Sequence, residues 1–242
     1  MASGWSADVD FNQLIDNFGI PLLEGLGVTL QVFGGAAILA TVVGLVVGLA
    51  RMSKRKVVRY PAVAFVEFFR GTAALVQLFW VFYALPLLLG LPLPPLWAAW
   101  VVIGCNQGAY LAEVVRGAIL AVPTNQVEAS IAINLDPRTR WRRVIIPQAI
   151  PIIVPTYTNH IITILKETAI VSLIGIHDMT HTANTLRTQF GNTALIFLTI
   201  AAIYLAVALF LAWLGRQLER RVDIYRPPNR SKKRLLPVEV GS

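Results

Sequence analysis

Four long stretches without a charged residue constrain the fold of this chain more than any other feature. They are residues 25–50, 71–112, 144–165 and 188–215, which contain 26, 42, 22 and 28 residues. A helix needs about 20 predominantly apolar residues to cross a hydrocarbon layer of ~30 Å. Three runs therefore suffice for one span each, and the longest suffices for two. With 56% hydrophobic residues, the chain is predicted to be an all-α integral membrane protein.

The longest run contains a cluster of turn-forming residues that divides it. These residues are Pro86, Gly90, Pro92, Pro94 and Pro95. About five transmembrane helices are therefore predicted, at residues 25–50, 58–86, 96–120, 149–173 and 192–217. We expect a membrane domain at residues 25–221, an extracytoplasmic segment at residues 1–24 and a basic cytoplasmic tail at residues 222–242.

The basic residues predict the orientation of these helices. Segments 51–59, 138–143 and 216–234 contain 17 Lys and Arg residues, whereas Arg187 is alone on the opposite side. Because Lys and Arg are retained in cytoplasmic loops, the amino terminus is predicted outside and the carboxyl terminus inside a bacterial cell membrane. The net charge of +8 is thereby explained by topology, so we expect membrane lipid rather than nucleic acid as the surroundings.

Residues 123–147 form a polar, amphipathic segment in this apolar chain. From Glu128 to Pro147 the segment is too polar to cross a bilayer, and we expect a short cytoplasmic helix presented to a partner. Glu128 is expected at its start, where the helix dipole stabilises a carboxylate. Asn134 is expected to end it, because asparagine tolerates left-handed backbone geometry. The candidate coupling residues are Glu128, Ala129, Ser130, Asn134, Leu135 and Pro147.

The second predicted helix contains Glu67 and Arg70, three residues apart on one face, followed by Gln77. Charges within a span are costly and normally face a cavity or one another. Glu67 and Arg70 are therefore either a mutual ion pair or part of a translocation path, and the sequence leaves both interpretations open.

The third predicted helix contains Asn106, Tyr110 and Glu113 at spacings of four and three, which place them on one face. Arg116 follows Glu113 by three residues and lies near the cytoplasmic end. Asn106 and Glu113 are therefore the stronger candidates for a substrate path.

The fourth predicted helix carries Lys166, Glu167 and Thr168 in its outer half. Lys166 either extends to the membrane surface or meets a substrate carboxylate while Glu167 meets a cationic group. The full set of candidate substrate-path residues is Asn106, Tyr110, Glu113, Lys166, Glu167, Thr168, Glu67, Arg70 and Gln77.

Two further features have mainly structural interpretations. Gly44 and Gly48 permit close helix contact, either within one subunit or between subunits. The single cysteine and the three histidines lack acidic or cysteine partners at metal-ligand spacing, so no metal site is expected. Packing, capping and hydrogen bonding are the expected roles of Cys105, His160, His177 and His181.

Several of these motifs together resemble one protein family. Glu128-Ala129, followed by Ile145-Ile146-Pro147, resembles the coupling motif of ABC importer permeases, although Asn134 stands where that family usually has Gly. The stretches 67–72, 108–117 and 166–168 resemble its polar amino-acid branch, the histidine/glutamate/glutamine/arginine/opine type. That branch commonly has Pro at Ala73 and Asp at Glu167. Residues 79–80, 134–137 and 168–171 resemble the ectoine and hydroxyectoine permeases most.

The resemblance covers residues 25–221 and implies a type I ABC importer permease fold with a cytoplasmic coupling helix. It also implies a second permease subunit, either the same or a sister chain, two cytoplasmic ATPase subunits and an extracytoplasmic solute-binding protein. The chain has no Gly-x-x-x-x-Gly-Lys-Ser/Thr loop. ATP and magnesium are therefore expected in the partner ATPases, and this polypeptide is not expected to be an enzyme.

The expected function is ATP-driven import of a polar or zwitterionic amino acid or derivative, with ectoine or hydroxyectoine as the specific candidates. Glutamate, glutamine, arginine and histidine are alternative substrates. A secondary transporter is a remote alternative, because it would usually show internal repeats and more helices. A non-transport assembly protein is another, but it would not require the coupling segment.

Overall fold

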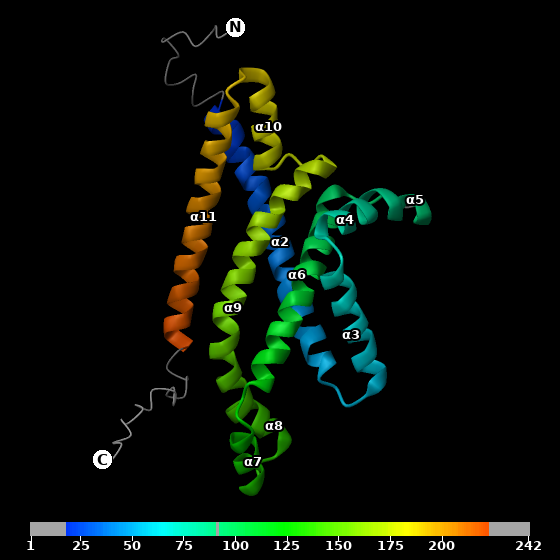
Figure 1. Ribbon diagram of the computed structural model, residues 1–242, viewed down its shortest axis with the longest axis vertical. Helices are drawn as coiled ribbons and strands as arrows, with labels where there is room; N and C mark the ends of the chain where they lie inside the picture. Colours follow the sequence, from blue (N-terminus) through cyan, green and yellow to red (C-terminus); the bar gives the residue numbers. More distant parts are fainter. Residues whose placement is uncertain (1–17, 91, 223–242) are drawn as a thin grey trace, which may run out of the picture.

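The computed structural model describes residues 18–90 and 92–222, and its regular elements are all helices (Figure 1). The long helices are α2 (Ile20–Arg51), α6 (Pro95–Leu120), α9 (Ile146–Glu167) and α11 (Thr193–Val222). The shorter ones are α3 (Lys56–Gly71), α4 (Ala74–Phe79), η2 (Trp80–Ala84), α5 (Leu85–Leu89), α7 (Thr124–Ala132), α8 (Pro137–Arg140), η3 (Trp141–Ile145), η4 (Thr168–Ile174) and α10 (Met179–Phe190).

Two of these helices, α2 and α11, are long and apolar enough to cross a membrane by themselves. Two bent pairs raise the number of spans to as many as four on the same criterion. The third predicted span corresponds to α6, which is less apolar because it carries Asn106, Gln107, Glu113 and Arg116. The total of five spans thus stays a prediction, since length and composition by themselves support up to four.

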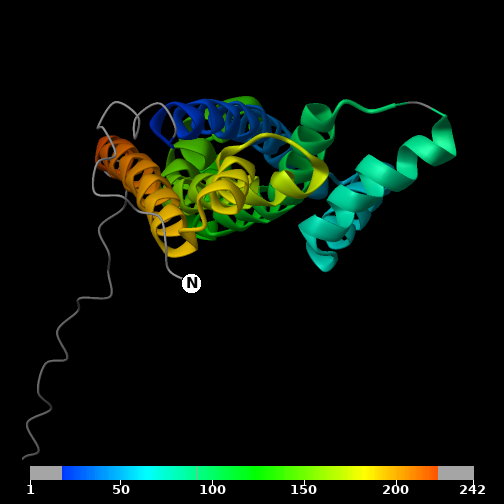
Figure 2. The same cartoon turned by 90° about the horizontal axis from the view of Figure 1, so that it is seen from above.

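The prediction that residues 58–86 form one continuous helix was wrong. Its two halves, α3 and the run from α4 to α5, meet at an angle of 104°. Thr72 and Ala73 between them are extended, with ψ of 148° and 134°. Seen from above, α4 and α5 form an arm that projects away from the rest of the molecule (Figure 2). The break leaves backbone carbonyls of α3 without helical partners, and side chains supply the missing donors, as described below.

Other helix ends also differ from the predicted boundaries. α2 begins at Ile20, within the predicted segment 1–24. The helix that contains the fourth predicted span begins well before residue 149, because the helical run from Pro137 to Ile174 is continuous through α8, η3, α9 and η4. α10 was not predicted; it is a polar helix whose amino end is capped by the Asp178 carboxylate, which accepts from the Thr180 and His181 amides.

The core lies where α2, α6 and α9 pack together, with Leu78 of α4 beside them. Gly44 and Gly48 make the close approach of α2 to α6 possible. A Cβ at Gly44 would lie 2.6 Å from Leu111 Cβ, and one at Gly48 would lie 2.9 Å from the Ala112 carbonyl oxygen. These small residues therefore serve packing within the subunit.

The long helices place α7 and α8 at one end of the molecule and α10 at the other (Figure 1). The turn between α2 and α3 lies toward the end that carries α7 and α8. The predicted cytoplasmic segments 51–59 and 138–143 thus lie on the same side. The first 17 residues and the tail from residue 223 onward lie outside the described residues.

Candidate substrate pocket and coupling segment

A polar pocket of about 320 Å³ opens at the break between α3 and α4. It is lined by residues of the break, of α6 and of α9. They are Thr72, Ala73, Ala74, Asn106, Gln107, Tyr110, His160, Thr163 and Glu167. Polar side chains within a membrane domain normally surround a functional cavity, so this pocket is the candidate solute site.

A chain of hydrogen bonds runs along one wall of the pocket. Gln107 Nε2 donates to Glu167 Oε1 over 2.7 Å, and Gln107 Oε1 lies 3.0 Å from His160 Nδ1. The second carboxylate oxygen of Glu167 is buried and has no hydrogen-bond partner among residues 18–90 and 92–222. A buried carboxylate oxygen without a partner is costly, and a cationic group in the pocket would satisfy it.

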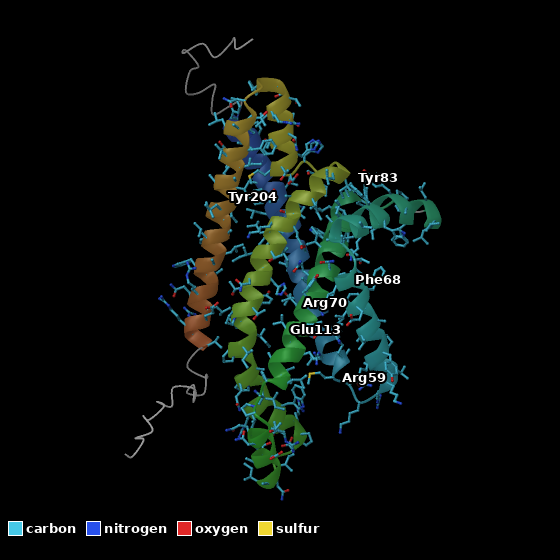
Figure 3. The ribbon with its side chains drawn as sticks, in the orientation of Figure 1. Arg59, Phe68, Arg70, Tyr83, Glu113 and Tyr204 are labelled. Carbon is cyan, nitrogen blue, oxygen red and sulfur yellow. The ribbon has the colours of Figure 1, made fainter. Side chains whose placement is uncertain are left out.

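A cation lies against another wall. The guanidinium carbon of Arg70 stands 5.2 Å from the centre of the Tyr110 ring, which is a cation–π distance. Tyr110 also stacks with the His160 ring at 6.0 Å between ring centres. Figure 3 shows Arg70 on α3 next to α6, which carries Glu113. The pocket therefore has a carboxylate in one wall and a guanidinium next to another.

Gln77 and Asn106 hold the broken helix together through side-chain hydrogen bonds to its backbone. Asn106 Nδ2 donates to the Phe69 carbonyl over 2.9 Å, and Gln77 Nε2 donates to the same carbonyl over 3.1 Å. Gln77 also donates to the Thr72 carbonyl and hydroxyl, and its own Oε1 accepts from Asn106. These bonds replace the helical donors that the break removes. Asn106 also lines the pocket.

The mutual pair of Glu67 and Arg70 is not formed in the described part of the chain. Arg51 instead lies 4.0 Å from Glu67 and forms an ion pair with Glu113. Glu113 also accepts from Arg116 at 3.0 Å. Glu67 and Glu113 are thus joined through Arg51, and neither of them lines the pocket.

Lys166 and Glu167 do not face the same site. Glu167 lines the pocket, whereas Lys166 is exposed and is not part of its lining. Successive residues of an α-helix are rotated by roughly 100°, so neighbours face different directions. Thr168 is fully buried, and its hydroxyl donates to the Leu165 carbonyl. The structure therefore does not bring Lys166 and Glu167 together in this pocket, and a contact of Lys166 with the solute stays a prediction.

Four polar residues of the pocket were missing from the predicted site, along with Ala73 and Ala74: they are Thr72, Gln107, His160 and Thr163. The expected hydrogen-bonding role of His160 is confirmed, although its place in the pocket was not foreseen. The sequence did offer a signal for Gln107, because two adjacent polar amides, Asn106 and Gln107, stand inside a 42-residue uncharged run. Thr72 and Thr163 are ordinary residues in helical proteins, and only the assembled helices single them out.

The coupling segment forms the short helix α7, but its boundaries differ from those expected. The helix begins at Thr124, so Glu128 is its fifth residue and lies beyond the first turn. The expectation that the helix dipole stabilises the Glu128 carboxylate was therefore wrong, because that effect falls off within the first turn. Glu128 and Ala129 are exposed, whereas Ser130 is buried and donates to the Val127 carbonyl. Pro147 belongs to the first turn of α9.

Asn134 ends α7 as predicted. Its φ is +56°, the one positive value among the described non-glycine residues. The Leu135 amide donates back to the Ser130 carbonyl over 3.0 Å, which is the bond that closes a Schellman turn. Next to this turn, Ile131 and Ile133 are 50% and 71% exposed. A helix with an exposed carboxylate and exposed isoleucines is suited to contact another protein.

No group of three His, Cys, Asp or Glu residues arranged for a metal ion occurs among residues 18–90 and 92–222. The rings of His177 and His181 pack edge to face near the amino end of α10, with their centres 4.6 Å apart. At the start of α8, hydrogen bonds from Thr139 hold the pKa of the exposed Asp136 carboxyl below its usual value.

The arrangement of a broken helix, a polar pocket between spans and a helix presented at one end defines a membrane transport subunit. Residues 40–224 match the model of the family "Binding-protein-dependent transport system inner membrane component". This chain belongs to that family. It is the inner-membrane, permease component of an ABC importer for amino acids, and its family is one of transport permeases rather than enzymes.

Similar proteins narrow the class further. The probable amino-acid ABC transporter permease protein y4tF of Sinorhizobium fredii is 37% identical over 211 residues, covering 85% of this chain and 89% of that protein. The arginine transport system permease protein ArtQ of Bacillus subtilis is 32% identical over 215 residues, covering 89% and 98%. A crystal structure of an amino acid ABC transporter with histidines matches with a TM-score of 0.80 and 34% identity, covering 88% of this chain and 99% of that one. The fold is the type I ABC importer permease fold.

Proposed function

We propose that this permease passes a polar or zwitterionic amino acid through the pocket between α3, α6 and α9. The single observation that carries the proposal is the unpartnered, buried Oε2 of Glu167 in the pocket lining. An ammonium, guanidinium or amidinium group of the solute would satisfy this oxygen. Arg70, which lies over Tyr110, would meet the solute carboxylate.

The charges suggest an order of preference among solutes. A site with one carboxylate and one guanidinium compensates both ends of a zwitterion without leaving a net buried charge. Glutamine and neutral histidine fit these charges, and arginine fits with one of its two cationic groups left over. Glutamate fits least well, because its second carboxylate would lie in a pocket that already contains Glu167. Relatives named for arginine and for glutamine transport, and the structure with histidines, are consistent with such solutes without ranking them.

Ectoine or hydroxyectoine is a second candidate, supported by the sequence motifs at residues 79–80, 134–137 and 168–171. Their cationic amidinium group would also satisfy Glu167. The pocket chemistry accepts both kinds of solute, so the discrimination has to come from transport measurements.

We further propose that the permease works as a pair with itself or a sister chain. Two cytoplasmic ATPases, which bind ATP and magnesium, would dock on α7, and an extracytoplasmic binding protein would deliver the solute. ATP-driven closure of the ATPases would then open the pocket alternately to the two sides of the membrane. The exposed Glu128, Ile131 and Ile133 support α7 as the docking helix.

The test is uptake by the complete complex in proteoliposomes with its binding protein. Radiolabelled arginine, histidine, glutamine, glutamate and ectoine are compared in the presence and absence of ATP. ATP-dependent uptake of a cationic or zwitterionic amino acid, with glutamate poorest, supports the proposal. Uptake of ectoine in preference to every amino acid supports the second candidate, and glutamate as the best substrate overturns the assignment of Glu167.

A further inference from the structure

Arg51, the last residue of α2, links three helices at a point below the pocket. It forms an ion pair with Glu113 of α6 and lies 4.0 Å from Glu67 of α3. Glu113 in turn binds Arg116 at 3.0 Å. The Arg51 side chain is only 11% exposed although it carries a full charge, so its two acidic partners are what make its burial tolerable.

Three contacts join α3 to α6, and their residues on α6 lie about one helical turn apart. Asn106 binds the Phe69 carbonyl, Tyr110 stacks with Arg70, and Glu113 reaches Glu67 through Arg51. Arg70 therefore belongs to the middle contact, between a hydrogen bond on one side and the ionic contact on the other.

The ionic contact around Arg51 is close on the side of Glu113 and distant on the side of Glu67. Arg51, Glu113 and Arg116 join α2 to α6, and these two helices are locked together by the glycine contacts described above. Glu67 lies at the edge, with its side chain 67% exposed and its carboxylate at the 4.0 Å limit of ion pairing.

α3 also has an apolar contact with α6. Its Val66 is buried on Ala109 and Ala112 of α6, with Phe65 and Phe69 packed against the same cluster. Among the described residues, the contact between Glu67 and Arg51 is the ion pair that joins α3 to the other helices.

We propose that Arg51 is a positioning residue: through Glu67 it holds α3 against α6, and this fixes Arg70 over Tyr110 at the pocket wall. The consequence for transport rests on the proposed function, in which Arg70 meets the solute carboxylate. Arg51 does not touch the solute. Loss of its contact with Glu67 therefore weakens solute capture without removing any group of the pocket.

The experiment uses the complete reconstituted complex and compares Glu67→Gln, Arg51→Gln and the double variant. Each single variant is expected to raise the half-saturating solute concentration about two- to fivefold, as for loss of a partly exposed ion pair, with the maximal rate little changed. The double variant should be no worse than Arg51→Gln, because both changes remove the same contact. Additive effects, or unchanged half-saturation in Glu67→Gln, overturn the proposal. Arg59→Gln, at the other end of α3, is the matched control.

A distance measurement separates this proposal from the proposed function. With Cys105 replaced by Ser, spin labels at Val57→Cys of α3 and Leu120→Cys of α6 report the separation of the two helices. Glu67→Gln should broaden that distance distribution, and an unchanged distribution overturns the positioning role whatever the transport result. Arg70→Gln tests the proposed contact of Arg70 with the solute. If this variant leaves the half-saturating solute concentration unchanged, that contact is wrong. The distance measurement still decides the role of Arg51.

Discussion

Gln107 donates from Nε2 to Oε1 of Glu167 over 2.7 Å, and so joins the middle of α6 to the end of α9 inside the membrane domain. The two residues are 60 positions apart in the chain. This bond directs one carboxylate oxygen toward Gln107 and leaves the other buried without a partner. This free carboxylate oxygen is the feature of the pocket that most specifically favours a cationic group in the solute.

Glu167→Gln is expected to lower uptake efficiency about 10- to 100-fold, because hydrogen bonds to a charged group contribute ~1.5–3 kcal/mol. The glutamine keeps an oxygen that accepts from Gln107, so the fold should persist. Uptake in proteoliposomes and co-purification of the ATPase measure the two effects. Lys166→Gln is the matched control, because Lys166 is exposed and lies outside the pocket lining. The complex with this variant should transport within about twofold of the parent complex. An equal loss in both variants would contradict this picture.

Gln77→Ala is expected to destabilise the membrane domain by ~1–3 kcal/mol, because the Thr72 carbonyl loses its side-chain donor and the Phe69 carbonyl keeps only that of Asn106. The apparent melting temperature of the purified complex measures this effect. Val76→Ala is the control on the same helix, because Val76 is 63% exposed. If the two variants melt at the same temperature, the hydrogen bonds of Gln77 do not hold the break.

Ala129→Pro is expected to abolish substrate-stimulated ATP hydrolysis, because a proline in the middle of a helix costs ~3 kcal/mol or more. Glu128→Ala should lower the stimulation as well. Losing a desolvated charge contact between Glu128 and the ATPase would weaken the docking by ~2–5 kcal/mol. Thr124→Pro is the control, since proline is tolerated at the first position of a helix. Normal stimulation in Ala129→Pro would show that α7 is not the coupling helix.

Asn134→Gly should preserve coupling, whereas Asn134→Val should weaken it and speed proteolysis of the segment from Thr124 to Asp136. A β-branched residue at a φ of +56° is strained, and left-handed geometry costs an ordinary residue ~1–2 kcal/mol. Cleavage rates of the assembled complex provide the measurement. Equal cleavage of the valine and glycine variants would mean that the turn does not depend on this residue.

The orientation in the membrane can be tested with a reporter that is active only outside the cytoplasm. We expect it to be silent when fused after Ser242 and active when inserted near Gly90, following the distribution of basic residues. The reverse pattern would overturn the predicted topology.

The sequence by itself determined the features that depend on neighbouring residues. The uncharged runs predicted a helical membrane protein, because a span must be uniformly apolar over its whole length. The spacing of Asn106, Tyr110 and Glu113 predicted a shared face, and all three contact α3 or its ionic link. Asn134 predicted a helix end from its own backbone preference, and the structure confirms it.

Only the tertiary structure decided which polar groups meet. The pairs of Gln107 with Glu167 and of Arg51 with Glu113 join residues 60 or more positions apart, and periodicity within one helix carries no information about them. The 104° break after Gly71 also depends on Asn106, a donor from another helix, to satisfy the carbonyls that it frees. Local sequence therefore indicated which long stretches are helical and which faces are polar, but it did not indicate the break after Gly71 or the helix α10. The solute pocket arose from how α3, α6 and α9 pack, because burial and pairing of charges are set by the assembled neighbours.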